Sequence, residues 1–162
     1  MDAALSIPTV LGLAFAIGCV CGLRSMMGPA LVCWGAHLGW LNLVGSRLVF
    51  LRMAICVAIF SLFAIGELVA DKLPGIPGRN TAVSLIVRFL SGGFCGLVLA
   101  IAGHAPLAVA FLLGGLGGLA GGLGGYYVRR NIKRAFKLPD FPVALTEDLI
   151  AIGAGLFIVS RF

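Results

Sequence analysis

Charged residues are scarce in this sequence, and acidic residues are the scarcest. The 162 residues include 12 Lys and Arg but only 6 Asp and Glu, so that 11% of the chain is charged and 60% is hydrophobic. Soluble domains carry about 25% charged residues. This composition excludes an ordinary soluble domain and predicts an integral membrane protein. The apolar segments leave short connections, so we expect a single membrane domain over residues 1–162.

Patterns that hold metals or perform nucleophilic catalysis are also missing. All five cysteines lie in apolar stretches, without paired spacing in a polar loop and without histidines at ligand intervals. Ser25 has no His or Asp near it in sequence that would activate it as a nucleophile. We therefore expect no metal, no cofactor and no enzymatic activity. The N-terminus lacks the basic region of a signal peptide, so we expect the first apolar segment to be retained.

Long apolar segments divide the chain into pieces of membrane-spanning length. A helix needs about 20 residues to cross the bilayer, and none of the segments alternates polar and apolar residues as a barrel strand does. The segments run from Ile7 to Trp40, Leu48 to Ala70, Thr81 to Gly103, Pro106 to Val128 and Pro142 to Ser160. The sequence predicts an all-α fold, namely a polytopic membrane helical bundle of five to six transmembrane segments.

The first apolar segment contains one formally charged residue, Arg24, within the stretch Gly22–Pro29. A guanidinium stays charged at any ordinary pH, and placing one at bilayer depth costs at least about 2.5–3.5 kcal/mol. Gly28 and Pro29 favour a break, because proline removes a helical hydrogen bond. We expect the segment to be broken near Gly22–Pro29, with Arg24 at the bend. An unbroken segment would instead place Arg24 near the middle of the membrane.

A basic cluster follows the fourth apolar segment. Its members are Arg129, Arg130, Lys133, Arg134 and Lys137. Basic residues beside a membrane span orient it and contact anionic lipid, so the net charge of +6 does not indicate a nucleic-acid partner. The positive-inside rule predicts that the basic loop 129–137 is cytoplasmic, together with the loop of Lys72 and Arg79.

Glycines dominate the segment before this cluster. They include two series spaced by four residues: Gly114, Gly118 and Gly122, and Gly117, Gly121 and Gly125. Such spacing lets a neighbouring helix approach closely, as in many pairs of membrane helices. A phosphate-binding loop would need a preceding strand and a Lys-Ser/Thr pair, which this segment lacks. The glycines therefore predict a helix-packing surface.

Two pairs of carboxylates lie at the edges of apolar segments. Glu67 and Asp71 are four residues apart at the end of the second apolar helix, where like charges repel each other and oppose the helix dipole. Glu147 and Asp148 lie near the start of the last helix, where the dipole favours them. One interpretation is that these groups form a site with Arg24. The other is that they only pin helices together, for example through an ion pair of Glu67 with Arg24, Arg79 or Arg88.

Three sequence motifs together resemble those of a known family. They are Gly22-Leu-Arg-Ser-Met-Met-Gly-Pro29, Gly66-Glu-Leu-Val-Ala-Asp-Lys-Leu-Pro74 and Ala144-Leu-Thr-Glu-Asp-Leu-Ile-Ala151. The chain resembles, over nearly its whole length, the bacterial membrane family known as domain of unknown function 4126. The resemblance implies a helical protein of the bacterial inner (plasma) membrane and implies no activity. The characteristic residues of the family map onto Arg24, Glu67, Asp71, Lys72, Glu147 and Asp148.

These observations lead to a functional hypothesis. We predict a small membrane transporter or channel component, forming a homo-oligomer, whose polar site for a small ion or solute contains Arg24, Ser25, Glu67, Asp71, Glu147 and Asp148. Glu67 and Glu147 would bind a proton or cation, their acidic neighbours would tune them, and Arg24 would contact an anion or act as a countercharge. The alternative is a non-transporting lipid-binding or assembly protein in which the charges are structural.

Overall fold

The computed structural model describes residues 5–70, 81–136 and 140–162, and the regular structure in these ranges is entirely helical. The helices are α1 (Ile7–Leu23), α2 (Met27–His37), the short 3-10 helix η1 (Val49–Arg52), α3 (Ala54–Ala70), α4 (Ala82–Ala102), α5 (Leu107–Phe136) and α6 (Asp140–Val159). The predicted all-α fold is therefore confirmed. Asp71, Lys72, Arg79 and Lys137 lie outside the described residues.

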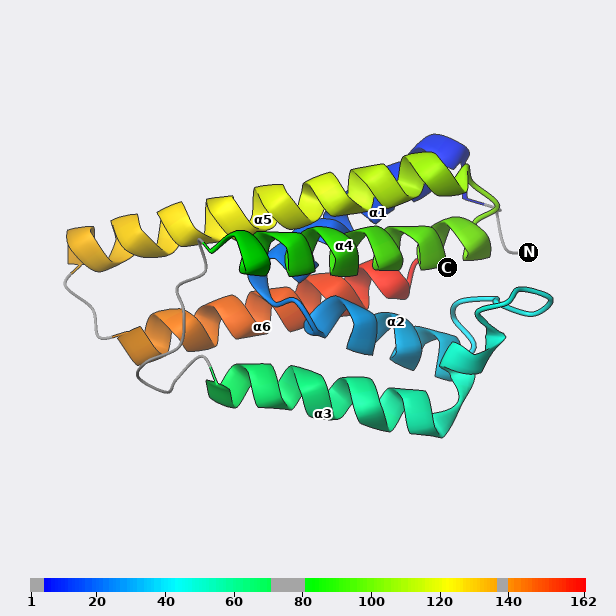
Figure 1. Cartoon of the computed structure of the whole chain (residues 1–162), viewed down its shortest axis with the longest axis horizontal. Helices are drawn as coiled ribbons and strands as arrows, with labels where there is room; N and C mark the ends of the chain where they lie inside the picture. Colours follow the sequence, from blue (N-terminus) through cyan, green and yellow to red (C-terminus); the bar gives the residue numbers. More distant parts are fainter. Residues whose placement is uncertain (1–4, 71–80, 137–139) are drawn as a thin grey trace.

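The first apolar segment is two helices that meet at Arg24. Its backbone is extended, with φ −141° and ψ 111°, so the helix cannot continue through it. Pro29 is the third residue of α2, in the first turn, where a missing N–H costs no helical hydrogen bond. The two helices run in opposite directions from this point and form a hairpin (Figure 1).

Helices that follow each other in the chain run in alternating directions, as Figure 1 shows. α1, α4 and α5 pack closely against one another, and α6 packs against both α1 and α2. α3 lies at the edge, where it packs mainly on α2 and η1. The tip of the α1–α2 hairpin lies among α3, α5 and α6, and both α5 and α6 extend past it toward the end where α5 ends and α6 begins.

Glycines allow α1, α4 and α5 to approach at backbone contact. A Cβ added to Gly18 or to Gly92 would collide with the carbonyl oxygen of Gly114, and one added to Gly22 would collide with the backbone of Gly118 and Gly122. The predicted glycines of α5 divide between two neighbours. Gly117 and Gly121 face the backbone of α1, Gly118 faces the Arg88 carbonyl of α4, Gly122 faces the Arg88 side chain, and Gly125 faces the Leu23 and Glu147 side chains.

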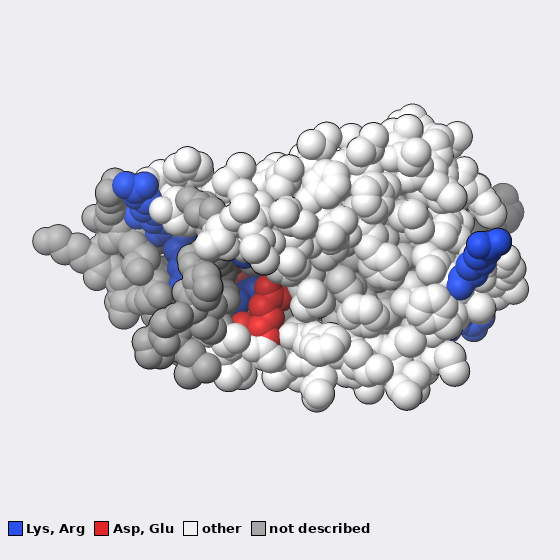
Figure 2. Space-filling model, in the orientation of Figure 1, with Lys and Arg blue, Asp and Glu red and all other residues white. Residues whose placement is uncertain are grey.

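The outer faces of the helices carry large apolar side chains. Leu62, Val83 and Leu149 are each more than 60% exposed, and similar residues cover the other helices. In Figure 2 most of the described surface along the length of the molecule carries no charged side chain, basic side chains lie toward its two ends, and acidic side chains form a small patch between them. Among the described residues, two helices are long and apolar enough to cross a membrane, Ala82–Ala102 and Leu107–Asn131; Ile7–Leu23 and Ala54–Ala70 are apolar but shorter.

Two predicted boundaries near the basic cluster are wrong. Residues 129–136 do not form a loop, because α5 continues to Phe136. Arg, Lys and Ala are good helix formers, and neither Gly nor Pro interrupts this stretch. The last helix begins at Asp140 rather than after Pro142, since proline is tolerated in a first turn.

Two alanine substitutions in α5 test the glycine contacts. Gly114→Ala places a methyl group against backbone that cannot move aside alone, so we expect the free energy of unfolding to fall by about 1–3 kcal/mol. Gly124→Ala is the matched control, because a Cβ there meets nothing within 4 Å. It should stabilise the helix by up to about 1 kcal/mol. Denaturant unfolding in detergent micelles, followed by circular dichroism, measures both, and equal effects would contradict the close approach.

Candidate functional site

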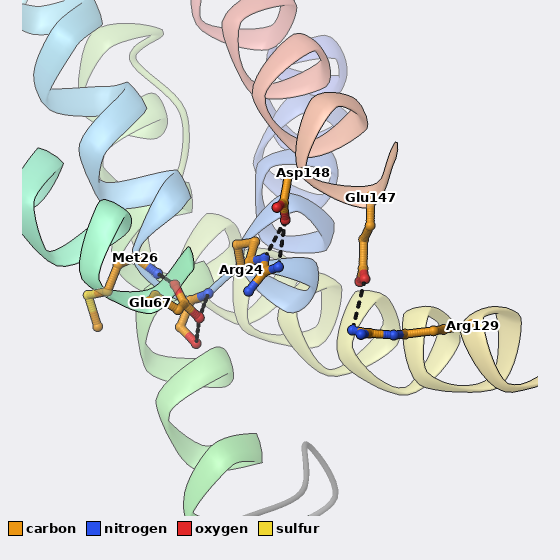
Figure 3. Close-up of polar contacts among 7 residues, drawn as sticks. Arg24, Met26, Glu67, Arg129, Glu147 and Asp148 are labelled. Atoms are coloured by element: carbon orange, nitrogen blue, oxygen red, sulfur yellow. Dashed lines mark hydrogen bonds and ion pairs between the residues drawn. The ribbon is translucent and has the colours of Figure 1, made fainter. Parts of the chain in front are cut away.

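Arg24 forms a buried ion pair with Asp148 of α6. Its Nε donates a hydrogen bond to Asp148 Oδ1 at 2.7 Å, and its Nη2 lies 2.6 Å from the same oxygen (Figure 3). The exposed fractions are 1% for Arg24 and 5% for Asp148. Charge-assisted hydrogen bonds of this length are among the strong ones, which offsets part of the cost of removing both charges from water. Of the carboxylates proposed as partners of Arg24, the described structure thus selects Asp148.

Glu67 caps the start of α2 from another helix. Its Oε1 accepts hydrogen bonds from the Ser25 N–H at 2.8 Å and the Ser25 hydroxyl at 3.0 Å, and its Oε2 accepts one from the Met26 N–H at 2.8 Å. No side chain of α2 itself caps this end. A carboxylate at a helix N-terminus is favoured by the unpaired N–H groups and by the helix dipole. This position offsets the unfavourable location of Glu67 near the C-terminal end of α3.

The ion pair of Glu67 with an arginine, one of the alternatives considered, is not formed within the described residues. From the sequence, Glu67 at the end of its helix was expected to need a bound cation, a proton or an ion pair with another helix. Main-chain N–H groups satisfy the same need without a positive side chain. They become available because the chain breaks at Arg24, and that break leaves the N–H groups of Ser25 and Met26 without helical acceptors.

Glu147 points away from Asp148 and toward α5. Its Oε2 lies 3.7 Å from Arg129 Nη1, and Figure 3 shows the two side chains meeting between α6 and α5. Arg129 was predicted to contact anionic lipid, which stays a prediction; its side chain is 19% exposed and faces Glu147. Arg130 is exposed, as a lipid contact requires. Lys133 and Arg134 lie on α5, and their side chains are outside the description.

Arg88 of α4 is a buried charge that sequence reasoning did not place in the site. It is 4% exposed, its Nε donates to Ser84 Oγ at 3.1 Å, and its side chain lies against Gly122 of α5. The signal was available in the sequence, because Arg88 is the single charged residue between Thr81 and Gly103. The buried or partly buried charged side chains described around the hairpin tip are Arg24, Arg88, Arg129, Glu67, Glu147 and Asp148.

Burial separates these carboxylates into two kinds. Asp148 is enclosed and is bonded to the Arg24 guanidinium, so it has little contact with water. Glu67 and Glu147 are partly exposed, so a proton or a cation reaches them from water more readily. In the described part of the chain no three His, Cys, Asp or Glu side chains are grouped so that they could hold a metal ion. The arrangement suits the exchange of protons or ions at Glu67 and Glu147 beside a fixed ion pair.

Single and double substitutions measure the buried ion pair. Asp148→Asn or Arg24→Gln leaves one charge buried without its partner, and each should lower the free energy of unfolding by about 3–5 kcal/mol. Changing both together, as Arg24→Met with Asp148→Leu, should cost less than the sum of the single changes. Unfolding in detergent micelles provides the measurement. Additive losses would show that the two side chains do not depend on each other.

Comparison with known proteins gives a family and no activity. No curated protein and no solved structure shows significant similarity to this chain. A family profile matches residues 11–160, which is nearly the whole sequence and includes every residue of the site. The chain belongs to the family described as "Domain of unknown function (DUF4126)".

Proposed function

We propose that this protein is a small multi-pass transporter or channel component of the bacterial inner membrane, with its polar site at the break between α1 and α2. The observation that carries the proposal is that break. It places a permanently charged guanidinium and a helix start capped by the partly exposed Glu67 carboxylate together inside an apolar bundle. Interrupted helices with buried ionisable groups are typical of substrate and ion sites in membrane transporters.

The apolar exterior supports the membrane location. A water-soluble monomer rarely exposes a continuous apolar surface of the kind that covers these helices, whereas a bilayer solvates it. α1 and α3 have 17 residues each, about 26 Å of helix, which is close to the roughly 30 Å of hydrocarbon in a bilayer. We propose that the basic end of α5 is cytoplasmic, following the positive-inside rule. Assembly into a homo-oligomer stays a prediction.

The depth of Arg24 follows from its neighbours on α5. Leu23, directly before Arg24, packs at the level of Gly125, and the apolar part of α5 ends near Val128. Three residues of helix correspond to about 4.5 Å. In a membrane, Arg24 would therefore lie below the headgroups on the cytoplasmic side. There, water that enters between helices could reach the partly exposed Glu67 and Glu147.

The roles of the residues differ from those expected from sequence. Asp148 was expected to tune its neighbour, but it holds the Arg24 side chain in place. Glu67 is the carboxylate best placed to respond to a proton or cation, because its oxygens join α3 to the hairpin tip through three hydrogen bonds. A change at Glu67 thus alters how two parts of the bundle are connected. Such a link between binding and conformation is what transport requires.

One observation favours the alternative, a non-transporting assembly or lipid-binding protein. The exposed Arg130 and the basic residues that follow it lie on a helix that extends past the apolar part of the bundle. Clusters of this kind attract anionic headgroups, each basic residue contributing about 1 kcal/mol near the surface. In that case the ion pairs would contribute to stability alone. The wild-type protein would pass no ions, and neutralising Glu67 would have no effect on ion flux.

A flux assay in proteoliposomes separates these proposals. The panel consists of protons, sodium, potassium, chloride and phosphate, with empty liposomes for background. We expect wild-type protein to pass at least one of these ions above background, and Glu67→Gln to lose most of that flux. Arg161→Gln, a change of one charge at the opposite end of the bundle, is the matched control and should behave as wild type. Absence of wild-type flux across the panel would overturn the transporter proposal.

A further inference from the structure

α3 is the least enclosed helix for which the packing is fully described. Two of its 17 residues are buried, Val57 and Ala64, whereas nine of the 21 residues of α4 are. Its packing is mainly with α2 and η1, and Figure 1 shows it along one side of the bundle. Few apolar contacts therefore hold α3 in place, and helices with few buried contacts are those that move at low cost.

Three polar contacts tie α3 and the segment before it to the hairpin. At the charged end, Glu67 binds the Ser25 and Met26 groups. In the middle, the Trp34 indole donates to Ser61 Oγ at 3.1 Å. At the other end, His37 Nδ1 lies 2.8 Å from the Arg52 carbonyl oxygen. The charged end is held most strongly, since three hydrogen bonds to a carboxylate exceed one between neutral groups.

A hinge lies at the start of α3. Met53, between η1 and α3, has an extended backbone with φ −70° and ψ 136°, so no helical hydrogen-bond ladder runs continuously through it. η1 in turn is anchored by Leu51, which is 1% exposed. α3 is about 25 Å long, so a tilt of roughly 10° at Met53 would move its charged end by about 4 Å. That displacement would break all three bonds of Glu67.

We propose that α3 is a hinged gate over the α1–α2 junction and that the Glu67 carboxylate is its latch. Glu67 is the single charged residue of α3. Among the described residues, the charged groups on the parts that pack against α3 are Arg24, already paired with Asp148, and Arg52 at the hinge end, and the titratable ones are His37, also at the hinge end, and the Cys33 thiol of α2. A proton or cation on Glu67 would therefore weaken the latch directly, because the carboxylate would lose capacity to accept the three donors.

This inference deepens the proposed function, since it identifies what a proton or cation at Glu67 would do. Opening would expose the Ser25 and Met26 N–H groups beside Arg24, all of them donors suited to an anion. When the gate closes, the Glu67 carboxylate takes the place of the anion at the Ser25 and Met26 N–H groups. The geometry of the latch does not depend on which ion passes, so the gate is tested separately from transport.

Distances between spin labels in lipid nanodiscs test the gate. One pair of labels replaces Val69 at the charged end of α3 and Val83 on α4, and a second pair replaces Ile55 near the hinge and Leu107 on α5, all four being exposed positions. The native cysteines are replaced first. We expect Glu67→Gln to shift the Val69–Val83 distance distribution to longer, broader values, while the Ile55–Leu107 distribution stays unchanged. Ser25→Ala, which removes one of the three bonds, should give a smaller shift.

Glu147→Gln is the matched control, because it makes the same chemical change at a carboxylate that faces Arg129 of α5. It should leave both distributions as in the wild type. An unchanged Val69–Val83 distribution in folded Glu67→Gln protein would overturn the gate. Equal shifts of the Val69–Val83 and Ile55–Leu107 distributions would overturn it too. A shifted distribution without any ion flux would keep the gate and reject the transporter.

A second measurement uses the native tryptophan. In a Trp40→Phe background, Trp34 reports the contact between α2 and α3 through its bond to Ser61. Brominated lipids quench an indole that lipid chains reach. We expect stronger quenching of Trp34 in Glu67→Gln than in the otherwise native protein, and no change in Glu147→Gln. Equal quenching of Trp34 in Glu67→Gln and in the protein that retains Glu67 would contradict the gate. This measurement needs no cysteine replacement, so it applies even if the cysteine-free protein does not fold.

Discussion

Compensation of the Arg24 guanidinium is the constraint on which this structure depends. A permanent charge enclosed at 1% exposure needs an anion at bonding distance, and Asp148 provides it from the last helix. That requirement fixes where α6 must lie relative to the hairpin. The extended backbone at Arg24 also leaves the next two N–H groups without acceptors inside the helix, and these recruit Glu67. One residue therefore positions two helices that are far from it in sequence.

The glycines of α5 also help to position the helices around Arg24, through close packing of backbones rather than through charge. Apolar side chains gain little by leaving lipid for protein, so membrane helices associate through close packing and polar contacts. α1 and α4 both approach the backbone of α5 at Gly114, and α1 follows α5 as far as Gly122. Arg88 uses the space beside Gly122 to run along α5. The glycines thereby bring the charged ends of α1 and α4 to one level, where the ion pairs form.

The sequence was sufficient for some of these features and not for others. Helix positions followed from apolar length, and the break near Gly22–Pro29 followed from Gly28 and Pro29, because each rests on local physics. The identity of the ion partner did not follow, since Glu67, Asp71, Glu147 and Asp148 are equivalent by charge and differ only in their direction in three dimensions. The capping of α2 by Glu67 was missed for a related reason: main-chain donors have no signature in sequence. The extension of α5 to Phe136 was missed because basic residues suggest a loop, although their helix propensity is high.

The separation of the ion-pair partners along the chain has a consequence for biogenesis. Asp148 is 124 positions after Arg24, and Glu67 is 42 positions after Ser25. During synthesis the residues of the α1–α2 hairpin are therefore made before either of their acidic partners. Glu67 becomes available first, when α3 has been made, and Asp148 becomes available only with α6. The Arg24 charge of α1 therefore gains its buried partner only after α2, α3, α4 and α5 have been made.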